Sequence, residues 1–258
     1  MNLQLQNRLF LVGGATAGFG NALSRSLIAE GAKIIAVARN AERLFEFASE
    51  FPQNVEAING DITDPEIIGE IVDYVGDMRL DGMVVNAGGP PAKSLLESNL
   101  EDWDTAYFSV LRWKVDLVKA FLPKFQQQKY GRMLFIESIS VKQPVENLVL
   151  SNSFRLAVVG FVKTLSQEVA KEGITANILA PGFHDTEAVK RVLNKKAEVS
   201  GLSYQEAQHL MEKTIPVGRM GQPNEFASLA TWLLSPLSGY VTGQTISVDG
   251  GVIMGCFG

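Results

Sequence analysis

The sequence has a single cysteine, Cys256, and only two histidines among its 258 residues. One cysteine excludes an intramolecular disulfide, and nothing indicates an oxidising compartment, so we expect a cytoplasmic protein. His184 and His209 cannot supply the His/Cys cluster of a typical zinc site, although carboxylate and water ligands could hold a harder ion. We therefore expect no metal centre.

Dense basic runs and long apolar runs are also missing. The 23 basic and 28 acidic residues leave a net charge of −5, and no basic run is dense enough to follow a phosphate backbone. No apolar stretch approaches the roughly 18 residues that span a bilayer. The run from Leu9 to Val12 resembles the start of a signal peptide, but Gly13 and Gly14 interrupt it, so we interpret it as a buried strand. Neither nucleic acid nor a membrane is an expected partner.

What is present is an alternation of two kinds of segment, typical of an α/β protein. Short apolar runs alternate with longer stretches of helical period, as in parallel strands joined by crossover helices. Without any linker, the chain is expected to be one domain, residues 1–258. The expected strands are 9–12, 33–38, 55–58, 82–85, 132–136, 175–179 and 245–248. The expected helices are 18–30, 41–50, 65–75, 100–128, 151–171 and 223–234, with one or two amphipathic helices more within 185–213.

A glycine-rich turn follows the first expected strand. Gly14, Gly18 and Gly20 are spaced as GxxxGxG at the mouth of a helix. Residues without a Cβ let the backbone turn tightly and let a pyrophosphate approach the helix N-terminus, whose free N–H groups and dipole favour an anion. The motif predicts dinucleotide binding, although a glycine-rich turn without a ligand would have the same local sequence.

The end of the second expected strand has no carboxylate. An NAD-specific site usually has an acid there for the ribose hydroxyls, whereas this chain has Ala38, Arg39 and Asn40. The guanidinium of Arg39 could pair with a 2′-phosphate, which favours NADP over NAD as the cofactor. The alternative is a solvated arginine in a loop.

Several further motifs follow in a characteristic order. They are Asp61-Ile62-Thr63-Asp64, Asn86-Ala87-Gly88, Pro181-Gly182 with Thr186, Gly218 to Pro223, and Tyr240 to Gly243 leading to Val248-Asp249-Gly250-Gly251. Together with the glycine turn, they make the chain from about residue 5 to residue 251 resemble the short-chain dehydrogenase/reductase family, and within it the 3-oxoacyl-acyl-carrier-protein reductases. The resemblance implies a Rossmann-type, doubly wound, seven-stranded parallel sheet.

The resemblance also implies where the cofactor lies. Asp61 and Ile62 would lie beside the adenine, the Asn86 motif along the cofactor, and Pro181, Gly182 and Thr186 near the nicotinamide. The implied binding residues are Gly14, Thr16, Gly18, Phe19, Gly20, Arg39, Asp61, Ile62, Asn86, Ala87, Gly88, Arg155, Pro181, Gly182 and Thr186.

The catalytic end departs from the family pattern, an Asn, Ser, Tyr, Lys tetrad in which the tyrosine transfers a proton and the lysine holds the nicotinamide ribose. Ser138 aligns with the family's serine, but Val110 stands for the asparagine and the YxxxK motif reads Ser151-Asn152-Ser153-Phe154-Arg155. The YxxxxxxK spacing of enoyl reductases is missing too. We expect Ser138, Ser151 and Arg155 to form the site.

The proton donor stays open. A serine hydroxyl is far less acidic and shorter than a phenol, so Ser151 cannot simply replace the tyrosine, and Arg155 keeps its charge and cannot relay a proton. A water held by Ser138 and Ser151 is one candidate. His184 is another, because an unperturbed imidazole has a pKa of about 6.5, although a polar loop residue is the commoner explanation.

Two functions remain. The first is an NADP-preferring oxidoreductase for a carbonyl or hydroxyl substrate, with 3-oxoacyl thioesters as one candidate class; the second is a catalytically inactive dinucleotide sensor or scaffold. Segment 183–213 is expected to form a lid that carries substrate specificity. The family's use of its two longest helices, here 100–128 and 151–171, implies a homo-oligomer, either a tetramer or a dimer.

Overall fold

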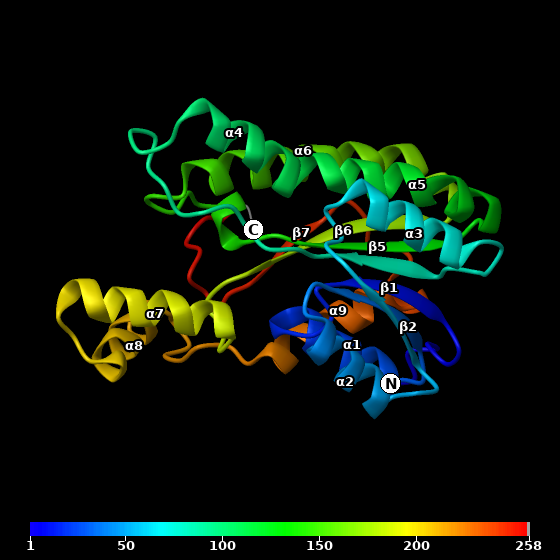
Figure 1. Ribbon diagram of the computed structural model, residues 1–258, viewed down its shortest axis with the longest axis horizontal. Coiled ribbons are helices and arrows are strands. Elements are labelled where there is room, and N and C mark those ends of the chain that lie inside the picture. The colour runs from blue at the N-terminus through cyan, green and yellow to red at the C-terminus, as the bar shows by residue number, and fades with distance from the viewer. Residues whose placement is uncertain (257–258) are drawn as a thin grey trace.

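The computed structural model describes residues 1–256 and is built on one parallel sheet (Figure 1). Its seven strands lie in the order β3-β2-β1-β4-β5-β6-β7, which confirms the doubly wound, Rossmann-type architecture. The strands are β1 (Leu9–Gly13), β2 (Lys33–Ala38), β3 (Val55–Asn59), β4 (Gly82–Val85), β5 (Gly131–Ile136), β6 (Ile174–Pro181) and β7 (Thr245–Val248). The chain order reverses between β1 and β4, and in such sheets ligands bind beside the carboxyl ends of the strands at this point.

Helices cover both faces of the sheet (Figure 1). One face carries α1 (Gly18–Ala29), α2 (Ala41–Glu50) and α9 (Pro223–Leu234), and the other carries α3 (Pro65–Val75), α4 (Leu100–Ala106), α5 (Trp113–Gln128) and α6 (Val149–Val169). Alternate residues of β1 face opposite sides of the sheet. Phe10 and Val12 belong to the hydrophobic core beneath α1, α2 and α9, and Leu11 belongs to the core on the other face, beneath α3, α5 and α6. Two buried faces explain why the strands are almost continuously apolar.

The segment expected to be one regular helix, 100–128, is interrupted. A π-helical segment, Tyr107–Arg112, separates α4 from α5. A π-turn closes hydrogen bonds over five residues instead of four and often lies at a functional site. Val110 is buried within it, and Trp113 and Lys114 are buried directly after it. Neither glycine nor proline marks this change, so the sequence gives no local signal for it.

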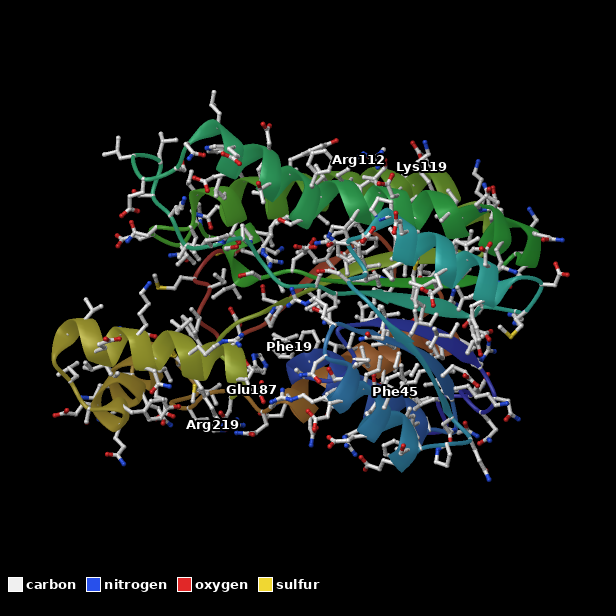
Figure 2. All side chains as sticks on the ribbon, viewed as in Figure 1. Phe19, Phe45, Arg112, Lys119, Glu187 and Arg219 are labelled. Carbon is white, nitrogen blue, oxygen red and sulfur yellow. The ribbon has the colours of Figure 1, made fainter. Side chains whose placement is uncertain are left out.

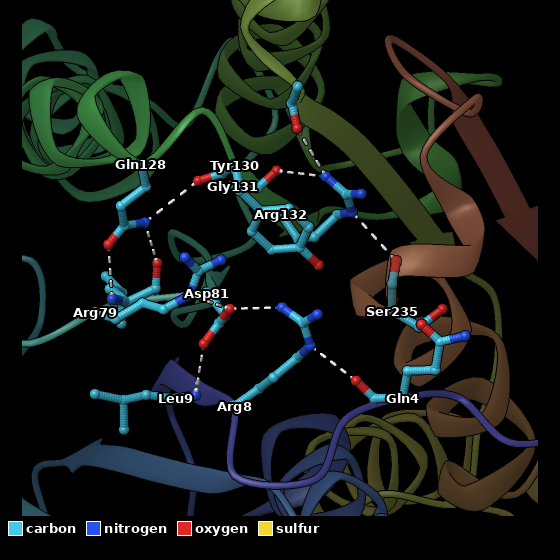
Figure 3. Close-up of polar contacts among 12 residues, drawn as sticks. Gln4, Arg8, Leu9, Arg79, Asp81, Gln128, Tyr130, Gly131, Arg132 and Ser235 are labelled. Carbon is cyan, nitrogen blue, oxygen red and sulfur yellow. Dashed lines mark hydrogen bonds and ion pairs between the residues drawn. The ribbon is translucent and has the colours of Figure 1, made fainter.

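The amino ends of the strands are closed by a polar cluster on the side away from the carboxyl ends (Figure 3). Asp81 Oδ1 accepts hydrogen bonds from Arg8 Nη1 at 2.6 Å and Arg79 Nε at 2.9 Å. The guanidinium of Arg132 stacks 4.3 Å from the ring centre of Tyr130. Because the charged groups of this cluster pair with one another, this end of the sheet is a structural closure and the open end lies at the carboxyl ends of the strands.

The lid segment extends beyond the sheet at the side (Figure 1). It forms α7 (Glu187–Ser200) and α8 (Tyr204–Glu212), as its amphipathic pattern predicts. The two helices have their own small core, made by Leu193, Ala197, Ala207, Met211, Ile215 and Met220. Among residues 1–256, no helix is long and apolar enough to cross a membrane.

Candidate cofactor and active site

A cleft of about 910 Å³ lies at the carboxyl ends of the strands, between the sheet and the lid. Phe19, at the start of α1, and Glu187, at the start of α7, both line it (Figure 2). Its walls come from the carboxyl ends of the five strands β1 to β5 and the segments after them, from two helical positions and from the lid, namely Gly14, 16–19, 37–40, Arg43, 60–63, 86–89, Ser109, Ile136, Glu137, Arg155, 186–188 and Arg191. The fold therefore brings most of the expected cofactor-binding residues to one elongated surface.

The glycine turn leaves the start of α1 open to the cleft. Gly14 and Gly18 have φ values of +65° and +50°, which glycine adopts without strain. A Cβ at Gly20 would lie 2.2 Å from the Gly14 carbonyl oxygen, so only glycine fits there. No side chain caps the N-terminus of α1, and its first turn holds no acid. These features suit a pyrophosphate, because the free N–H groups point at the ligand.

Asn86 supports this turn from the neighbouring strand. Its Nδ2 donates a hydrogen bond to the Gly13 carbonyl at 3.1 Å, and a Cβ on Gly14 would lie 2.8 Å from the same nitrogen. Ala87 and Gly88 continue along the floor of the cleft. Asn86 thus fixes the glycine loop, a role that the motif alone did not specify.

The end of the cleft beside β2 and β3 is rich in arginine. Arg39 Nη1 lies 3.6 Å from Asp61 Oδ2, with 77% of the arginine side chain exposed. Arg43 and Arg191 line the same end, and Arg43 pairs with Glu187 of the lid. Ile62 is buried beneath this end. Sequence reasoning found Arg39 but missed Arg43, which is four residues further on, and Arg191, which is distant in the chain; both line the cleft.

The opposite end holds a buried charge triad that the motif comparison did not predict. Arg155 Nη1 donates to Glu137 Oε2 at 2.8 Å, and Lys114 Nζ donates to Glu137 Oε1. Arg155 Nε also donates to Ser151 Oγ at 3.0 Å, across one turn of α6. The exposed fractions of the Lys114, Glu137 and Arg155 side chains are 4%, 0% and 11%. We call Lys114, Glu137 and Arg155 the charge triad.

Burial changes the titration of Lys114. Burial lowers the pKa of Lys114. The Glu137 carboxylate raises this pKa, and the positive charge of Arg155 lowers it again. A charged carboxylate this deep in a protein needs partners, since an isolated buried charge costs several kcal/mol. Lys114 and Arg155 supply them from two different helices.

The remaining expected catalytic residues lie beside this triad. Ser151 is buried. Ser138 follows Glu137, and its Oγ accepts from the Ser140 N–H at 3.2 Å at the start of a short 3₁₀-helix, Ile139–Val141. Neither serine is among the residues that line the cleft, whereas Glu137 and Arg155 are. The wall at this end therefore includes Glu137 and Arg155, whereas Lys114 and the two serines do not line the cleft.

The segment after β6 joins the sheet to the lid. The Gly182 N–H donates to the Val248 carbonyl at 2.9 Å, next to Pro181, which ends β6. Thr186 caps α7 by accepting from the Val189 N–H at 3.3 Å, and it lines the cleft. Of the three residues expected near the nicotinamide, Thr186 thus reaches the cleft, while Pro181 and Gly182 anchor its edge.

His184 has a packing role in this segment. Its Nδ1 lies 3.2 Å from the Gly182 carbonyl oxygen, and its ring contacts Phe19 and Phe226 edge-on, with centroid distances of 5.0 Å and 6.0 Å. Burial lowers the pKa of His184. These surroundings favour a neutral imidazole that packs the start of α1 against the segment between β6 and α7. They do not favour a proton donor.

The sequence did contain signals for the missed groups. Glu137 directly follows the apolar strand β5, and Lys114 lies on the buried face of a helix between Trp113 and Leu117. A charge at either place needs a buried partner. No group of three or more His, Cys, Asp or Glu side chains that could hold a metal occurs within residues 1–256.

Comparison with known proteins identifies the family. A family model described as "Enoyl-(Acyl carrier protein) reductase" matches residues 14–253. The chain belongs to the short-chain dehydrogenase/reductase family. The 3-oxoacyl-acyl-carrier-protein reductase FabG of Thermotoga maritima is 30% identical over 257 residues, covering 98% of this chain and 100% of that protein.

Solved structures share the architecture over nearly the whole chain. L-sorbose reductase from Gluconobacter frateurii, complexed with NADPH and L-sorbose, has a TM-score of 0.92 at 26% identity and covers 99% of this chain and 100% of its own. YwfH, an NADPH-dependent reductase involved in bacilysin biosynthesis, has a TM-score of 0.91 at 26% identity, with coverages of 97% and 100%. This short-chain family member thus shares its fold with NADPH-linked reductases.

Proposed function

We propose that this protein is an NADP-preferring oxidoreductase that acts on a carbonyl or hydroxyl group. The observation that carries the proposal is the cleft itself, which has an uncapped helix N-terminus at its middle and arginines at one end. The first suits a pyrophosphate and the second suits a 2′-phosphate. The NADPH found with L-sorbose reductase and the NADPH dependence of YwfH support the same choice.

The cofactor fits with its adenosine half beside Arg39, Asp61 and Ile62 and its nicotinamide half beside the charge triad. NADPH supplies the hydride when bound. Arg155 is the group of this chain suited to stabilise negative charge that develops on the substrate oxygen, because its guanidinium lies at the cleft wall. Ser138 and Ser151 are the residues proposed to hold a proton-donating water.

The substrate class is the open part of the proposal. The similarity to 3-oxoacyl-acyl-carrier-protein reductases favours 3-oxoacyl thioesters, and the lid of α7 and α8 is where we expect selectivity to reside. Incubation of the purified protein with labelled NADPH and a panel of 3-oxoacyl thioesters, ketones and aldehydes tests it. Oxidation of NADPH with one of these classes supports the proposal, and binding without oxidation of any contradicts it.

A catalytically inactive sensor or scaffold is the second candidate. The observation in its favour is the replacement of the family's tyrosine by Ser151, whose Oγ already accepts from Arg155. This alternative predicts tight NADPH binding and no turnover in the same substrate panel, so a single experiment separates the two.

We also propose that the protein is a cytoplasmic homo-oligomer, a tetramer or a dimer. Large apolar side chains are exposed around α4 and α6, with Leu96 98%, Leu100 83%, Phe108 61% and Leu156 54% exposed. Exposed apolar groups gathered in this way are typical of an interface. Light scattering at micromolar concentration should give a multiple of the 28.1 kDa chain mass; a monomer mass would contradict the assembly.

A further inference from the structure

The charge triad has an unequal number of positive and negative groups. Lys114 and Arg155 are cationic and Glu137 is anionic, so the three side chains together carry one positive charge. All three side chains are almost entirely buried, which means that solvent and salt screen this charge poorly. We take all three groups as charged, because the Glu137 carboxylate that accepts from Lys114 Nζ opposes the loss of the proton that burial favours.

The triad lies at a defined place along the cofactor. The arginines beside β2 and β3 mark the adenosine end of the cleft, the start of α1 marks the pyrophosphate, and Glu137 and Arg155 line the opposite end. A dinucleotide that spans these points has its nicotinamide beside the triad. A Cβ on Gly89 would lie 2.9 Å from Arg155 Nη2, so this nitrogen faces the loop that carries the Asn86 motif.

The two redox forms of the cofactor differ in charge at this end only. The nicotinamide ring is positive in NADP⁺ and neutral in NADPH, while the phosphates are the same. A buried positive charge repels the first and leaves the second unaffected, and one unit charge at a separation of roughly 10 Å is worth on the order of 10-fold at an effective dielectric constant near 20.

We propose that the buried triad makes the site selective for the reduced cofactor, with Lys114 as the residue that supplies the excess charge. Glu137 and Arg155 offset each other, so Lys114 decides whether the net charge is one or zero. The inference rests on the proposed function, because it concerns the same cofactor in the same cleft. It assigns Lys114 an electrostatic role without contact with the substrate, and it makes NADPH the form that occupies the free site in preference to NADP⁺.

The test measures the dissociation constants of NADP⁺ and NADPH for the wild type and two variants, by calorimetry at one pH and ionic strength. Lys114→Met removes the excess charge and leaves Glu137 paired with Arg155. The double variant Lys114→Met, Glu137→Gln restores the net charge of one, now on Arg155 alone. Lys119→Met, on the outer surface of α5 (Figure 2), is the matched control.

We expect the ratio of the NADP⁺ to the NADPH dissociation constant to be above one in the wild type. It should fall on the order of 5-fold in Lys114→Met, return towards the wild-type value in the double variant, and stay unchanged in Lys119→Met. If Lys114 had a purely structural role, the ratio of the two dissociation constants in the double variant would lie at least as far from the wild-type value as in the single variant.

Three outcomes would overturn the inference. One is a Lys114→Met variant whose ratio of dissociation constants equals that of the wild type. Another is a double variant whose ratio is as low as that of the single variant. A third, a wild type that binds neither form, would overturn the proposed function as well, so the two failures are distinguishable. If Lys114→Met does not fold, the double variant, which buries no unpaired acid, still gives the comparison with Lys119→Met, and a ratio below that control contradicts the proposal.

Discussion

Arg43 Nη1 lies 3.1 Å from Glu187 Oε2, so an ion pair joins the first turn of α2 to the first turn of the lid helix α7 across the mouth of the cleft. Both side chains are about half exposed, and such pairs contribute little to stability. The pair matters because Arg43 also lines the end of the cleft that suits a 2′-phosphate. A 2′-phosphate bound at this end would therefore compete with Glu187 for the Arg43 guanidinium.

Removing the competing carboxylate should strengthen NADPH binding. We expect Glu187→Gln to lower the NADPH dissociation constant by roughly 2- to 5-fold, in keeping with the modest strength of exposed ion pairs. NADH lacks the 2′-phosphate, so its affinity should not change. Calorimetry with both cofactors measures the difference, with Glu198→Gln on the same helix as a control. A gain shared equally by NADH would contradict the competition.

Arg39 should carry the preference for NADP. Among residues 1–256, its side chain makes one long contact, with Asp61, and is 77% exposed, which leaves its donors available to a phosphate. We expect the wild type to bind NADPH at least several-fold more tightly than NADH, and Arg39→Ala to lose on the order of 10-fold in NADPH affinity with little change for NADH. Equal affinities for the two cofactors in the wild type, or an Arg39→Ala variant that binds NADPH normally, would show that this arginine is merely solvated.

Arg155 should matter more to turnover than Ser151. Arg155 lines the cleft and holds Glu137, whereas Ser151 is buried and accepts from the arginine. If the protein is active, Arg155→Ala should reduce kcat on the order of 100-fold, the typical cost of losing an oxyanion donor. Ser151→Ala should be several-fold milder. Steady-state kinetics on the substrate that the panel identifies decides this, and the reverse order of effects would make Ser151 the principal group.

The acid side of the stability profile should depend on His184. Because burial lowers the pKa of His184 in the folded protein, the unfolded chain binds a proton first as the pH falls below about 6.5. The free energy of unfolding should therefore decrease between that pH and the lowered pKa, and the contribution of a neutral His184 is fully present above about 6.5.

Denaturant unfolding at about pH 7.5 and about pH 5.5 measures this loss, which should be about 1 kcal/mol greater in the wild type than in His184→Phe. Phenylalanine retains the ring against Phe19 and Phe226 but does not titrate. His209→Phe, at an exposed position on α8, should lose as much unfolding free energy between the two pH values as the wild type does. A His184→Phe variant with the same loss as the wild type would assign the slope to other groups.

The sequence predicted the strands and the cofactor motif well because both signals are local. All seven expected strands and the glycine turn occur where the apolar runs and the Gly14, Gly18, Gly20 spacing placed them. The charge triad could not be found in this way. Lys114 and Glu137 are 23 residues apart and Glu137 and Arg155 are 18 apart, so their contact depends on how α5 and α6 pack beside β5. The π-helical segment before α5 likewise has no sequence marker.

The separate core of the lid has a consequence for how such a protein can change. Leu193, Ala197, Ala207 and Met211 bury one another between α7 and α8, so the pair of helices is held together independently of the sheet. Its outward and cleft-facing positions are consequently free to vary without loss of the scaffold. If selectivity resides in this hairpin, as we propose, a new substrate preference needs substitutions there alone, and the nucleotide-binding half with its charge arrangement can stay unaltered.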